Sequence, residues 1–334
     1  MSSKVAVIYN EPIPGRYDAL GEKTAVLGVL EAVEAVQQAL AELEYIVVRV
    51  PLLPPLEDVR QKLAVLDAEL IFNLFEGFDD CPEAEARVAY ILSDLGLTYT
   101  GCQGDALSLA LDKGRAKSIL KEAGVDTPRY QLLDRKTLDV FHLNYPCIVK
   151  PCAEDASHGI SEDSVVSDPA TLARQVARIT DAFGGRALVE EYMEGREFNV
   201  TVLGNKSPEV LPISEIVYSL PPGMPRILTF SAKWEPESVY FRFTRPICPA
   251  EIEPDVHDRI ADAAISVFGL LGCSGYARVD FRLDAQGRPL VLEVNPNCDI
   301  SPSSGAARQA RAAGMTYSQF VERIALLPFE SKQS

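Results

Sequence analysis

Two strand-like segments near the end of the chain, residues 276–283 and 288–296, carry polar residues at alternating positions. Four side chains in these segments are of types that could do chemistry: Arg278, Asp280, Glu293 and Asn295. Because successive strand residues point to opposite faces, the two polar residues of each segment share a face. If the four residues between the segments close a hairpin, Arg278 lies opposite Glu293 and all four polar side chains share one face.

Two carboxylates and an amide oxygen that converge beside an arginine would suit a hard divalent cation that holds phosphates. The alternative is a solvated sheet face with a surface salt bridge, and the hairpin taken alone leaves both interpretations open. The opposite face of the hairpin is predicted to be core. It carries four apolar residues: Val279, Phe281, Leu292 and Val294.

Two lysines elsewhere in the chain could contact phosphates as point charges. Lys113 opens a helix-like segment, and an exposed surface lysine is its simplest alternative interpretation. Lys150 ends an apolar strand-like run just before a proline, next to a loop of small residues at 155–160. That loop could aim backbone N–H groups at an anion, or it could be a plain surface turn in which His158 has no catalytic part.

Carboxylates near residue 190 form a third group of candidates. Glu190 leaves a strand-like run and Glu197 follows a glycine, so both could accept hydrogen bonds from an adenine amino group and ribose hydroxyls. Charged strand ends in solvent are the alternative. The motifs G-x-x-x-x-G-K-[ST] and G-x-G-x-x-G are absent from the sequence, as is a Ser-His-Asp order. Cys298 has no histidine nearby in sequence and is interpreted as a small buried residue rather than a nucleophile.

The elements that must position these residues change in type along the chain. The first hundred residues alternate strand-like and helix-like segments, which predicts a parallel sheet covered by helices. In order, these are a strand at 5–8, a helix at 22–44, a strand at 46–50, a short helix after Pro55, a strand at 70–74 and a helix at 83–95. The middle of the chain predicts a helix at 113–123, a strand at 147–151 and a helix at 172–180.

The remainder of the chain is rich in strands before it ends in helices. Strands are predicted at 188–192, 198–203 and 215–218, then a helix at 254–271, the hairpin, and two helices after Gly305. Between these strands and the helix at 254–271 lies a long stretch at 221–249 that is predicted to be irregular. It is too long for an ordinary connector, which makes it a candidate lid.

Bulk properties narrow the class of protein. With 334 residues and 47% hydrophobic content, two or three domains are expected. A net charge of −16 argues against binding to nucleic acid or to anionic membranes, and no apolar run predicts a bilayer span or a signal peptide. Seven cysteines without a C-x-x-C pair fit reduced thiols, and the three histidines form no metal-ligand pattern. The sequence therefore predicts a cytoplasmic globular protein.

Taken together and in this order, several motifs resemble the ATP-grasp superfamily, and within it the D-alanine:D-alanine ligase family. The resemblance runs over nearly the whole chain and is densest after about residue 88. The matching stretches lie at residues 98–101 with 106–113, 148–151, 187–198, 231–234, 276–280, 292–295 and 313–317. Each stretch is a weak match alone, and their order and spacing carry the resemblance.

The resemblance implies an α/β protein with the ATP-grasp fold and three domains. An N-terminal parallel-sheet (pre-ATP-grasp) domain would span 1–100, a central α+β subdomain 101–186, and a C-terminal antiparallel-sheet subdomain with the metal site 187–330. ATP would be clasped between the central and C-terminal sheets. The family also suggests a homodimer.

The resemblance assigns a role to each candidate residue. The phosphates would be bound by Lys113 and Lys150, with Ser157 and Gly159 from the loop of small residues, and the adenosine by Glu190, Met193 and Glu197. Two Mg²⁺ ions, with Mn²⁺ as a substitute, would be held by Asp280, Glu293 and Asn295. Lys233 would close over the γ-phosphate from the lid, and Arg278 would stabilise charge on an acyl-phosphate and on a tetrahedral intermediate.

The reaction implied is phosphorylation of a carboxylate followed by attack of an amine, which forms an amide and releases ADP and phosphate. The metals and lysines would offset the charge that moves onto the leaving phosphate, while the closed lid excludes water. The expected substrates are small molecules of the amino-acid or dipeptide type.

The chain departs from the family mainly where the family binds its amino acids. Ala156 replaces a serine, Trp234 replaces the lid tyrosine, and Asp299 stands at the glycine whose N–H helps form the oxyanion hole. The N-terminal G-G-x-S-x-E-x-x-V-S signature is missing, and residues 10–15 stand there instead. Ser304 still matches the serine that binds the acceptor carboxylate, and Arg308 could assist it.

These departures predict a carboxylate–amine ligase whose substrates are not two D-alanines. One alternative is a true D-alanine:D-alanine ligase with unusual substrate contacts. Another is an ATP-binding regulatory module without catalysis, against which the presence of Arg278, Lys233 and all three metal ligands argues. A carboxylase of the biotin-dependent type is disfavoured by the C-terminal resemblance and the short chain.

Overall fold

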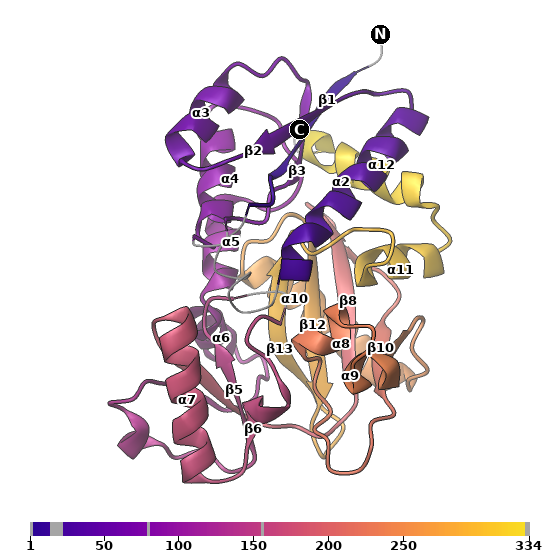
Figure 1. Ribbon diagram of the computed structural model, residues 1–334. Coiled ribbons are helices and arrows are strands. Elements are labelled where there is room, and N and C mark those ends of the chain that lie inside the picture. The colour runs from indigo at the N-terminus through magenta and orange to yellow at the C-terminus, as the bar shows by residue number, and fades with distance from the viewer. Residues whose placement is uncertain (1–2, 14–22, 79–80, 155–156, 331–334) are drawn as a thin grey trace.

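The computed structural model describes residues 3–13, 23–78, 81–154 and 157–330 (Figure 1). Three sheets follow one another along the chain. Four features predicted from the sequence fall partly or wholly outside the described residues: the loop at 10–15, the start of the first helix at Glu22, the start of the loop at 155–160, and Ala156.

The N-terminal sheet is parallel, as predicted, with the strand order β2-β1-β3. Its strands are β1 (Lys4–Asn10), β2 (Ile46–Leu52) and β3 (Leu70–Leu74), and its helices are α2 (Lys23–Glu42), α3 (Leu56–Ala64), α4 (Ala84–Asp94) and α5 (Gly104–Leu111). Alternate residues of β1 face opposite sides, so Val5 and Val7 pack against α2 while Ala6 and Ile8 pack against α3, α4 and α5. Both faces of the sheet are therefore buried, which explains its continuous apolar strands.

The central sheet is antiparallel with the order β4-β7-β5-β6. It consists of β4 (Tyr130–Leu133), β5 (Cys147–Pro151), β6 (Val165–Val166) and β7 (Ala187–Glu191), with α6 (Lys113–Glu122) before it, short 3₁₀ turns η1 (Leu138–Val140) and η2 (Glu162–Ser164), and α7 (Pro169–Phe183). Cys147 and Val149 face α7, so the alternate residues Ile148 and Lys150 point to the other face. The predicted ranges group residues 187–191 with the C-terminal part, whereas the pairing of β7 with β4 and β5 places them in the central sheet.

The C-terminal sheet is also antiparallel, with the order β11-β10-β8-β12-β13 and β9 beside β8. Its strands are β8 (Glu197–Gly204), β9 (Glu209–Val210), β10 (Ser214–Tyr218), β11 (Thr244–Ile247), β12 (Gly275–Leu283) and β13 (Pro289–Pro296). Helix α10 (Pro254–Leu270) covers the apolar face. Helix α11 (Gly305–Ala312) lies on the polar face, where Gln309 bonds to the backbone of Asn199 and Thr201.

The chain returns at its end to the N-terminal sheet. Helix α12 (Tyr317–Glu330) packs beside α2, and its Phe320 and Ile324 share a core with Val5 and Val7 of β1 (Figure 1). Of the helices in the described residues, none is both long and apolar enough to cross a membrane.

The segment at 221–249 is less irregular than predicted. It contains α8 (Phe230–Trp234), α9 (Val239–Phe243) and the edge strand β11, which pairs with β10. Side chains cap both short helices, because Thr229 accepts from the N–H of Ala232 and Ser238 from the N–H of Phe241. The prediction missed these helices because each is only five residues long.

The predicted register of the β12–β13 hairpin is wrong by two residues. Arg278 lies opposite Asn295, and Asp280 lies opposite Glu293. One residue of the shift arises at the turn, where Leu283 pairs with Pro289, and the other at a bulge that leaves Leu292 without a partner in β12. Because two single shifts restore the alternation, the four polar residues still share one face, as predicted.

The bulge also corrects the predicted core of the hairpin. Val279, Phe281 and Val294 are buried as expected, but the buried partner of Phe281 is Val291 rather than Leu292, which is only half-buried. The extra residue in β13 exchanges the faces of Val291 and Leu292.

Candidate functional site

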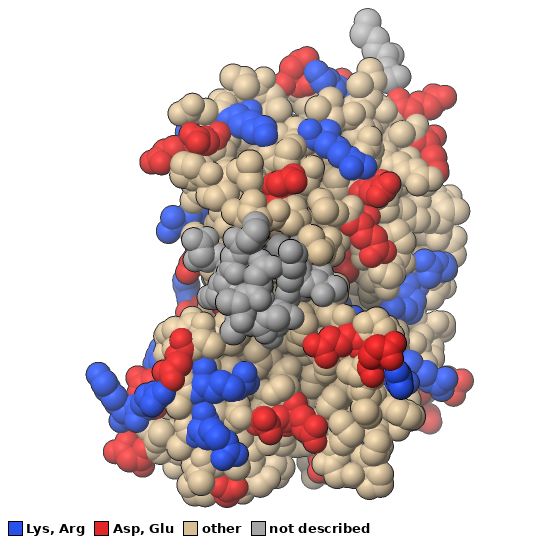
Figure 2. All heavy atoms as spheres, viewed as in Figure 1, with Lys and Arg blue, Asp and Glu red and all other residues tan. Residues whose placement is uncertain are grey.

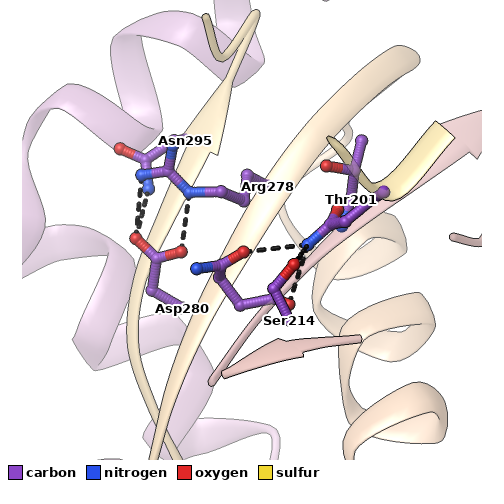
Figure 3. Close-up of polar contacts among 7 residues, drawn as sticks. Thr201, Ser214, Arg278, Asp280 and Asn295 are labelled. Carbon is purple, nitrogen blue, oxygen red and sulfur yellow. Dashed lines mark hydrogen bonds and ion pairs between the residues drawn. The ribbon is translucent and has the colours of Figure 1, made fainter. Parts of the chain in front are cut away.

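The polar face of the hairpin is organised around a forked ion pair (Figure 3). The guanidinium of Arg278 donates from Nε to Asp280 Oδ1 at 2.7 Å and from Nη2 to Asp280 Oδ2 at 2.9 Å. Asn295 Nδ2 donates to the same Oδ2 at 3.1 Å. Burial opposes the charge on Arg278, but the adjacent Asp280 outweighs it and raises the pKa of the guanidinium. The pair is therefore charged and fixed in one geometry.

A lysine from the central part of the chain reaches across to this hairpin. Lys113, the first residue of α6, lies with its Nζ 2.8 Å from Glu293 Oε1 and also donates to the backbone carbonyl of Glu154. Burial raises the pKa of Glu293, but Lys113, Lys150 and Lys233 together outweigh it and hold the pKa at about 2. The central and C-terminal parts of the molecule are thus joined by a charged contact at the candidate metal carboxylate.

A second buried carboxylate lies between two lysines. Glu190 is 1% exposed, and its oxygens lie 2.5 Å from Lys117 Nζ and 2.7 Å from Lys150 Nζ. Burial raises the pKa of Glu190, but the two ammonium groups more than reverse this effect and lower it. Lys117 also donates to Thr127 Oγ1 at 2.6 Å. In this arrangement the Glu190 carboxylate orients Lys150 on the face of the central sheet that looks toward the hairpin.

Glu197 at the start of β8 is held by a tyrosine and an arginine. Tyr218 donates its hydroxyl to Glu197 Oε2 at 2.8 Å, and Arg282 Nη2 lies 3.3 Å from the same oxygen. Burial and the charge of Glu197 raise the pKa of Tyr218, so its hydroxyl stays protonated and can donate. Met193 is close to Glu197 in sequence, in the turn before β8, and is half-buried.

The loop of small residues ends in two left-handed backbone conformations. Ser157 has φ 63° and Gly159 has φ 72°. A Cβ at Gly159 would lie 2.6 Å from Phe183, so both the conformation and the packing require glycine there. His158 is buried, and its ring lies 5.6 Å from that of Phe230 in the lid. The histidine therefore packs under the lid.

The candidate lid contacts the loop of small residues. The N–H of Phe230 donates to the carbonyl of Ile160 at 3.0 Å, which ties α8 to the loop of small residues. Burial and the nearby Arg278 lower the pKa of Lys233, while Asp280, Glu293 and Glu197 act in the opposite direction. The ammonium of Lys233 is thus close enough to the hairpin to interact with its charges.

The indole of Trp234 contacts the N-terminal part of the molecule. It packs against Gly28 in α2, where a Cβ would lie only 3.1 Å from Cη2 of the indole. The lid therefore contacts a helix of the N-terminal sheet as well as the loop of small residues.

In the segment after β13, the side chains of Asp299 and Ser304 bond to the segment itself and to the helix that follows it. Asp299 is exposed and accepts from the backbone N–H of Ser301 at 2.7 Å and from its hydroxyl at 3.0 Å. Ser304 caps α11 by accepting from the N–H of Ala307, and Arg308 donates to the carbonyl of Ser303. The side chain of Asp299 thus engages its own loop.

Two other residues of this segment, the half-buried Asn297 and the buried Cys298, contact neighbouring elements. Asn297, with φ 50°, accepts through Oδ1 from the N–H of Cys102 at 2.7 Å. Burial raises the pKa of the Cys298 thiol to about 12, so it is protonated at neutral pH, consistent with its interpretation as a buried, unreactive residue.

The donor set suits a hard cation bound together with phosphates. Asp280 and Glu293 are directly opposite each other and Asn295 is adjacent, so two carboxylates and one amide oxygen lie on one partly buried face. Within the described residues, no three His, Cys, Asp or Glu side chains gather in a metal-binding group. A cation here would complete its coordination with other oxygens, and phosphate oxygens are the ligands that the surrounding lysines would attract.

The chain matches a known family over most of this region. A family model described as the D-ala D-ala ligase C-terminus matches residues 119–326. The chain belongs to the D-alanine–D-alanine ligase family. The predicted enzyme class, an ATP-dependent ligase that forms C–N bonds, is thereby confirmed at the level of the family.

Individual relatives agree with this membership. The D-alanine–D-alanine ligase of Desulforudis audaxviator is 33% identical over 283 residues, which cover 82% of this chain and 85% of that protein. An uncharacterized protein of Sinorhizobium fredii, y4sG, is 35% identical over 260 residues, which cover 76% of this chain and 73% of that protein. The crystal structure of the D-alanine–D-alanine ligase of Bacillus anthracis with ATP aligns with a TM-score of 0.76 at 21% identity, covering 100% of this chain and 99% of that one. This structural likeness confirms the predicted ATP-grasp fold.

Three side chains that contact the candidate carboxylates were missed from the sequence: Lys117, Tyr218 and Arg282. Lys117 follows Lys113 by one helical turn, and Arg282 follows Asp280 by two residues on one strand, so periodicity could have revealed both. Tyr218 has no such indication, because its contact with Glu197 depends on the pairing of β10 with β8.

Proposed function

We propose that the chain is an ATP-dependent carboxylate–amine ligase that joins small amino-acid-like substrates through an acyl-phosphate, with substrates other than two D-alanines. One observation carries the proposal. Four cationic side chains surround the carboxylates of Asp280 and Glu293 where the central sheet, the hairpin and the lid meet: Lys113, Lys150, Lys233 and Arg278. Such a concentration of buried charge is suited to a polyphosphate that moves between acceptors.

The proposed cofactor contacts are those that the family resemblance implies. Asp280, Glu293 and Asn295 would hold divalent metal, two Mg²⁺ ions with Mn²⁺ as a substitute. When bound, the metal would neutralise charge on the phosphate oxygens. The phosphates of ATP would lie against Lys113, Lys150 and the loop at Ser157 and Gly159, and the adenosine against Glu190, Met193 and Glu197.

The chain's own residues would then serve the two chemical steps. Arg278 is held rigidly by Asp280, so its guanidinium can stabilise negative charge on the reacting carboxyl group without reorganising. Lys233 would approach the transferred phosphate from the lid. Because α8 is bonded to Ile160 and packed on Gly28, the closed lid would exclude water from the acyl-phosphate.

The altered substrates are supported by the residues at the other end of the site. Trp234 replaces a smaller aromatic residue and occupies space beside Gly28, and Asp299 stands in the loop that would contact the reacting carboxyl group. Ser304 and Arg308 would contact the acceptor. We also propose a homodimer, and domain ranges of 1–100, 101–186 and 187–330, with β7 contributing to the central sheet.

The face drawn in Figure 2 agrees with small-molecule substrates. Acidic and basic side chains are interspersed over the upper and lower parts of this face, and the chain as a whole carries a net charge of −16. A large basic patch of the kind that binds nucleic acid is not seen there.

The decisive test is ADP release by the purified protein with Mg²⁺ and ATP against a panel of D- and L-amino acids and dipeptides. Product mass spectrometry would then identify the amide. We expect ADP release with a substrate pair other than two D-alanines. Turnover that is fastest with D-alanine alone would contradict the altered-substrate proposal, and no ADP release across the panel would favour a regulatory module.

A further inference from the structure

Arg282 is a buried arginine at the edge of the proposed nucleotide site. It lies on β12, on the same face as Arg278 and Asp280, and is only 4% exposed. Removing a guanidinium from water is costly unless hydrogen-bond acceptors and an opposite charge replace the water. The partners that replace the water come from separate segments of the chain.

The guanidinium of Arg282 joins its own strand, β12, to two other segments. Its Nη2 lies 3.3 Å from Glu197 Oε2 at the start of β8. Its Nε donates to the carbonyl of Gly195 at 3.0 Å, and its Nη2 also donates to the carbonyl of Arg226. A planar guanidinium can make such divergent bonds together, whereas an ammonium group on a flexible stem cannot hold them in a fixed geometry.

Two tyrosines complete the cluster. The rings of Tyr192 and Tyr218 lie 5.5 and 5.8 Å from Cζ of Arg282, within the range of cation–π contacts. The Tyr192 hydroxyl accepts from the N–H of Arg226 at 2.9 Å and donates to its carbonyl at 3.3 Å. Both backbone groups of Arg226 are therefore held by this cluster.

Arg226 stands where the lid segment becomes buried. Arg226 itself is exposed, whereas Ile227 is 3% and Thr229 is 1% exposed. Ile227 packs with Ile148 of the central sheet, and the lid helix α8 starts four residues after Arg226. The anchoring of Arg226 thus sets where α8, with Lys233 and Trp234, begins.

We propose that Arg282 is a positioning residue that couples nucleotide binding to closure of the lid. One guanidinium orients the carboxylate of Glu197, the residue proposed to contact adenosine, and holds the backbone of Arg226 at the base of the lid. This inference rests on the proposed ATP site. Losing the guanidinium would free the carboxylate and the lid together, although Arg282 touches neither the phosphates nor the reacting carboxyl group.

The test compares Arg282→Met with the matched control Arg288→Met. Arg288 lies on the other strand of the same hairpin, where its side chain is 57% exposed and pairs with Asp284. Two measurements without nucleotide report on the lid: hydrogen exchange of residues 226–243, and the emission of Trp234, the one tryptophan of the chain. A third measures the dissociation constant for ATP with Mg²⁺ directly.

Arg282→Met should speed lid exchange, shift the Trp234 emission and raise the dissociation constant for ATP by about tenfold or more. Arg288→Met should change none of the three. Arg282→Lys, which keeps the charge but not the fork, should recover part of the ATP affinity and less of the lid protection. This pattern would not arise from a general loss of stability, which would accelerate exchange throughout the C-terminal sheet.

The experiment gives different results if the proposed function fails and if only the proposed role of Arg282 fails. If the wild-type protein binds no ATP, the proposed function is overturned and the coupling with it. If the wild type binds ATP and folded Arg282→Met binds it equally well, or leaves lid exchange and Trp234 emission unchanged, only the role of Arg282 is overturned. Should Arg282→Met fail to fold, Arg282→Lys decides in the same way, because wild-type values for all three measurements would overturn the role.

Discussion

The hairpin face and the loop that follows it are held in place by different forces. On the hairpin, Asp280 and Glu293 are fixed by partly buried ion pairs, one of which joins the hairpin to α6. In the loop at 297–304, the bonds of Asp299 and Ser304 are made within the loop and the helix that it starts. The hairpin carboxylates are fixed by ion pairs, whereas the side chains of Asp299 and Ser304 are fixed by short-range hydrogen bonds.

This difference indicates which residues of the site can be substituted and which cannot. Removing one partner of a buried ion pair leaves the other charge unpaired, which is strongly destabilising. Removing a local hydrogen bond of an exposed side chain such as Asp299 costs about 1 kcal/mol and leaves the remainder of the site in place. A ligase can therefore alter residues that contact its substrates while it keeps the groups that bind nucleotide and metal.

The largest expected effect is that of Asp280→Asn. The substitution removes a proposed metal ligand and the carboxylate that neutralises Arg278. We expect kcat for ATP turnover to fall by at least about a hundredfold, since preorganised charge at the reacting centre is lost. The measurement is steady-state ADP release with the substrate pair identified by the screen.

The control for Asp280→Asn is Asp284→Asn in the turn of the same hairpin. Asp284 bonds to Arg288 and to turn N–H groups, away from the proposed metal ligands. It should lose stability but keep its turnover. Equal turnover in Asp280→Asn and the wild type would break the distinction between the hairpin and the loop.

Glu293→Gln should reveal the charged contact as a pH dependence of stability. The pKa of Glu293 is held at about 2, below the ordinary 4.5, so the ionised form stabilises the fold above pH 4.5 and this contribution is lost as the pH falls toward 2. At neutral pH the variant should be less stable by up to about 3 kcal/mol, because each pKa unit between folded and unfolded states corresponds to about 1.4 kcal/mol. Chemical denaturation at a series of pH values measures this difference.

The difference in the free energy of unfolding between the wild type and Glu293→Gln should become smaller below about pH 4.5. As a control, Glu237→Gln breaks a pair with Arg242 in which both side chains are more than half exposed, and should cost no more than about 1 kcal/mol. If the difference in the free energy of unfolding between the wild type and Glu293→Gln stayed constant between pH 7 and pH 3, the carboxylate would not be held by the lysines.

The contrast between hairpin and loop also explains what the sequence could predict. Residue alternation placed the four polar side chains on one face, because the period of a strand is a local property. The register was wrong because it depends on the turn at Asp284 and on the bulge at Leu292, and neither is visible as a pattern in one strand. The short lid helices were missed for a related reason, since each is a single capped turn.

Contacts between sheets were the least predictable part of the site. The lysines were recognised as candidates, but the position of Glu190 between Lys117 and Lys150 depends on how α6 packs against the central sheet. The cluster around Arg282 likewise brings together the turn before β8, strand β12 and the lid. Such contacts arise from tertiary packing, which residue spacing does not encode.

Asp299→Ala tests the loop side of the comparison. The substitution removes two hydrogen bonds to Ser301, so the free energy of unfolding should fall by about 1 kcal/mol. The KM for the amino-acid substrate should change severalfold while the KM for ATP stays the same, because the loop lies beyond the hairpin. Steady-state kinetics with each substrate varied in turn would measure this split, and an equal change in the KM for ATP would contradict it.

The smallest effect is expected where the lid meets the N-terminal helix. Gly28 lies inside α2, where alanine would favour the helix by up to about 1 kcal/mol. A Cβ at this position would lie 3.1 Å from Cη2 and 3.3 Å from Cζ3 of Trp234, so the indole must move by a few tenths of an ångström. We expect Gly28→Ala to keep or slightly raise the stability, to shift the Trp234 emission and to raise the KM for the amino-acid substrate about twofold.

Gly269→Ala in α10 isolates the contact with the indole, because a Cβ at Gly269 would have no neighbour within 4 Å. Both variants gain the helix preference of alanine, but only in Gly28→Ala does the added Cβ contact the lid residue Trp234. For Gly269→Ala, thermal unfolding should therefore show a simple stabilisation, and the tryptophan emission should match that of the wild type. For Gly28→Ala, the tryptophan emission should differ from that of the wild type. If the two variants gave the same tryptophan emission, Trp234 would not contact α2 in solution. The absence of a side chain at Gly28 would then not affect substrate selection by the protein.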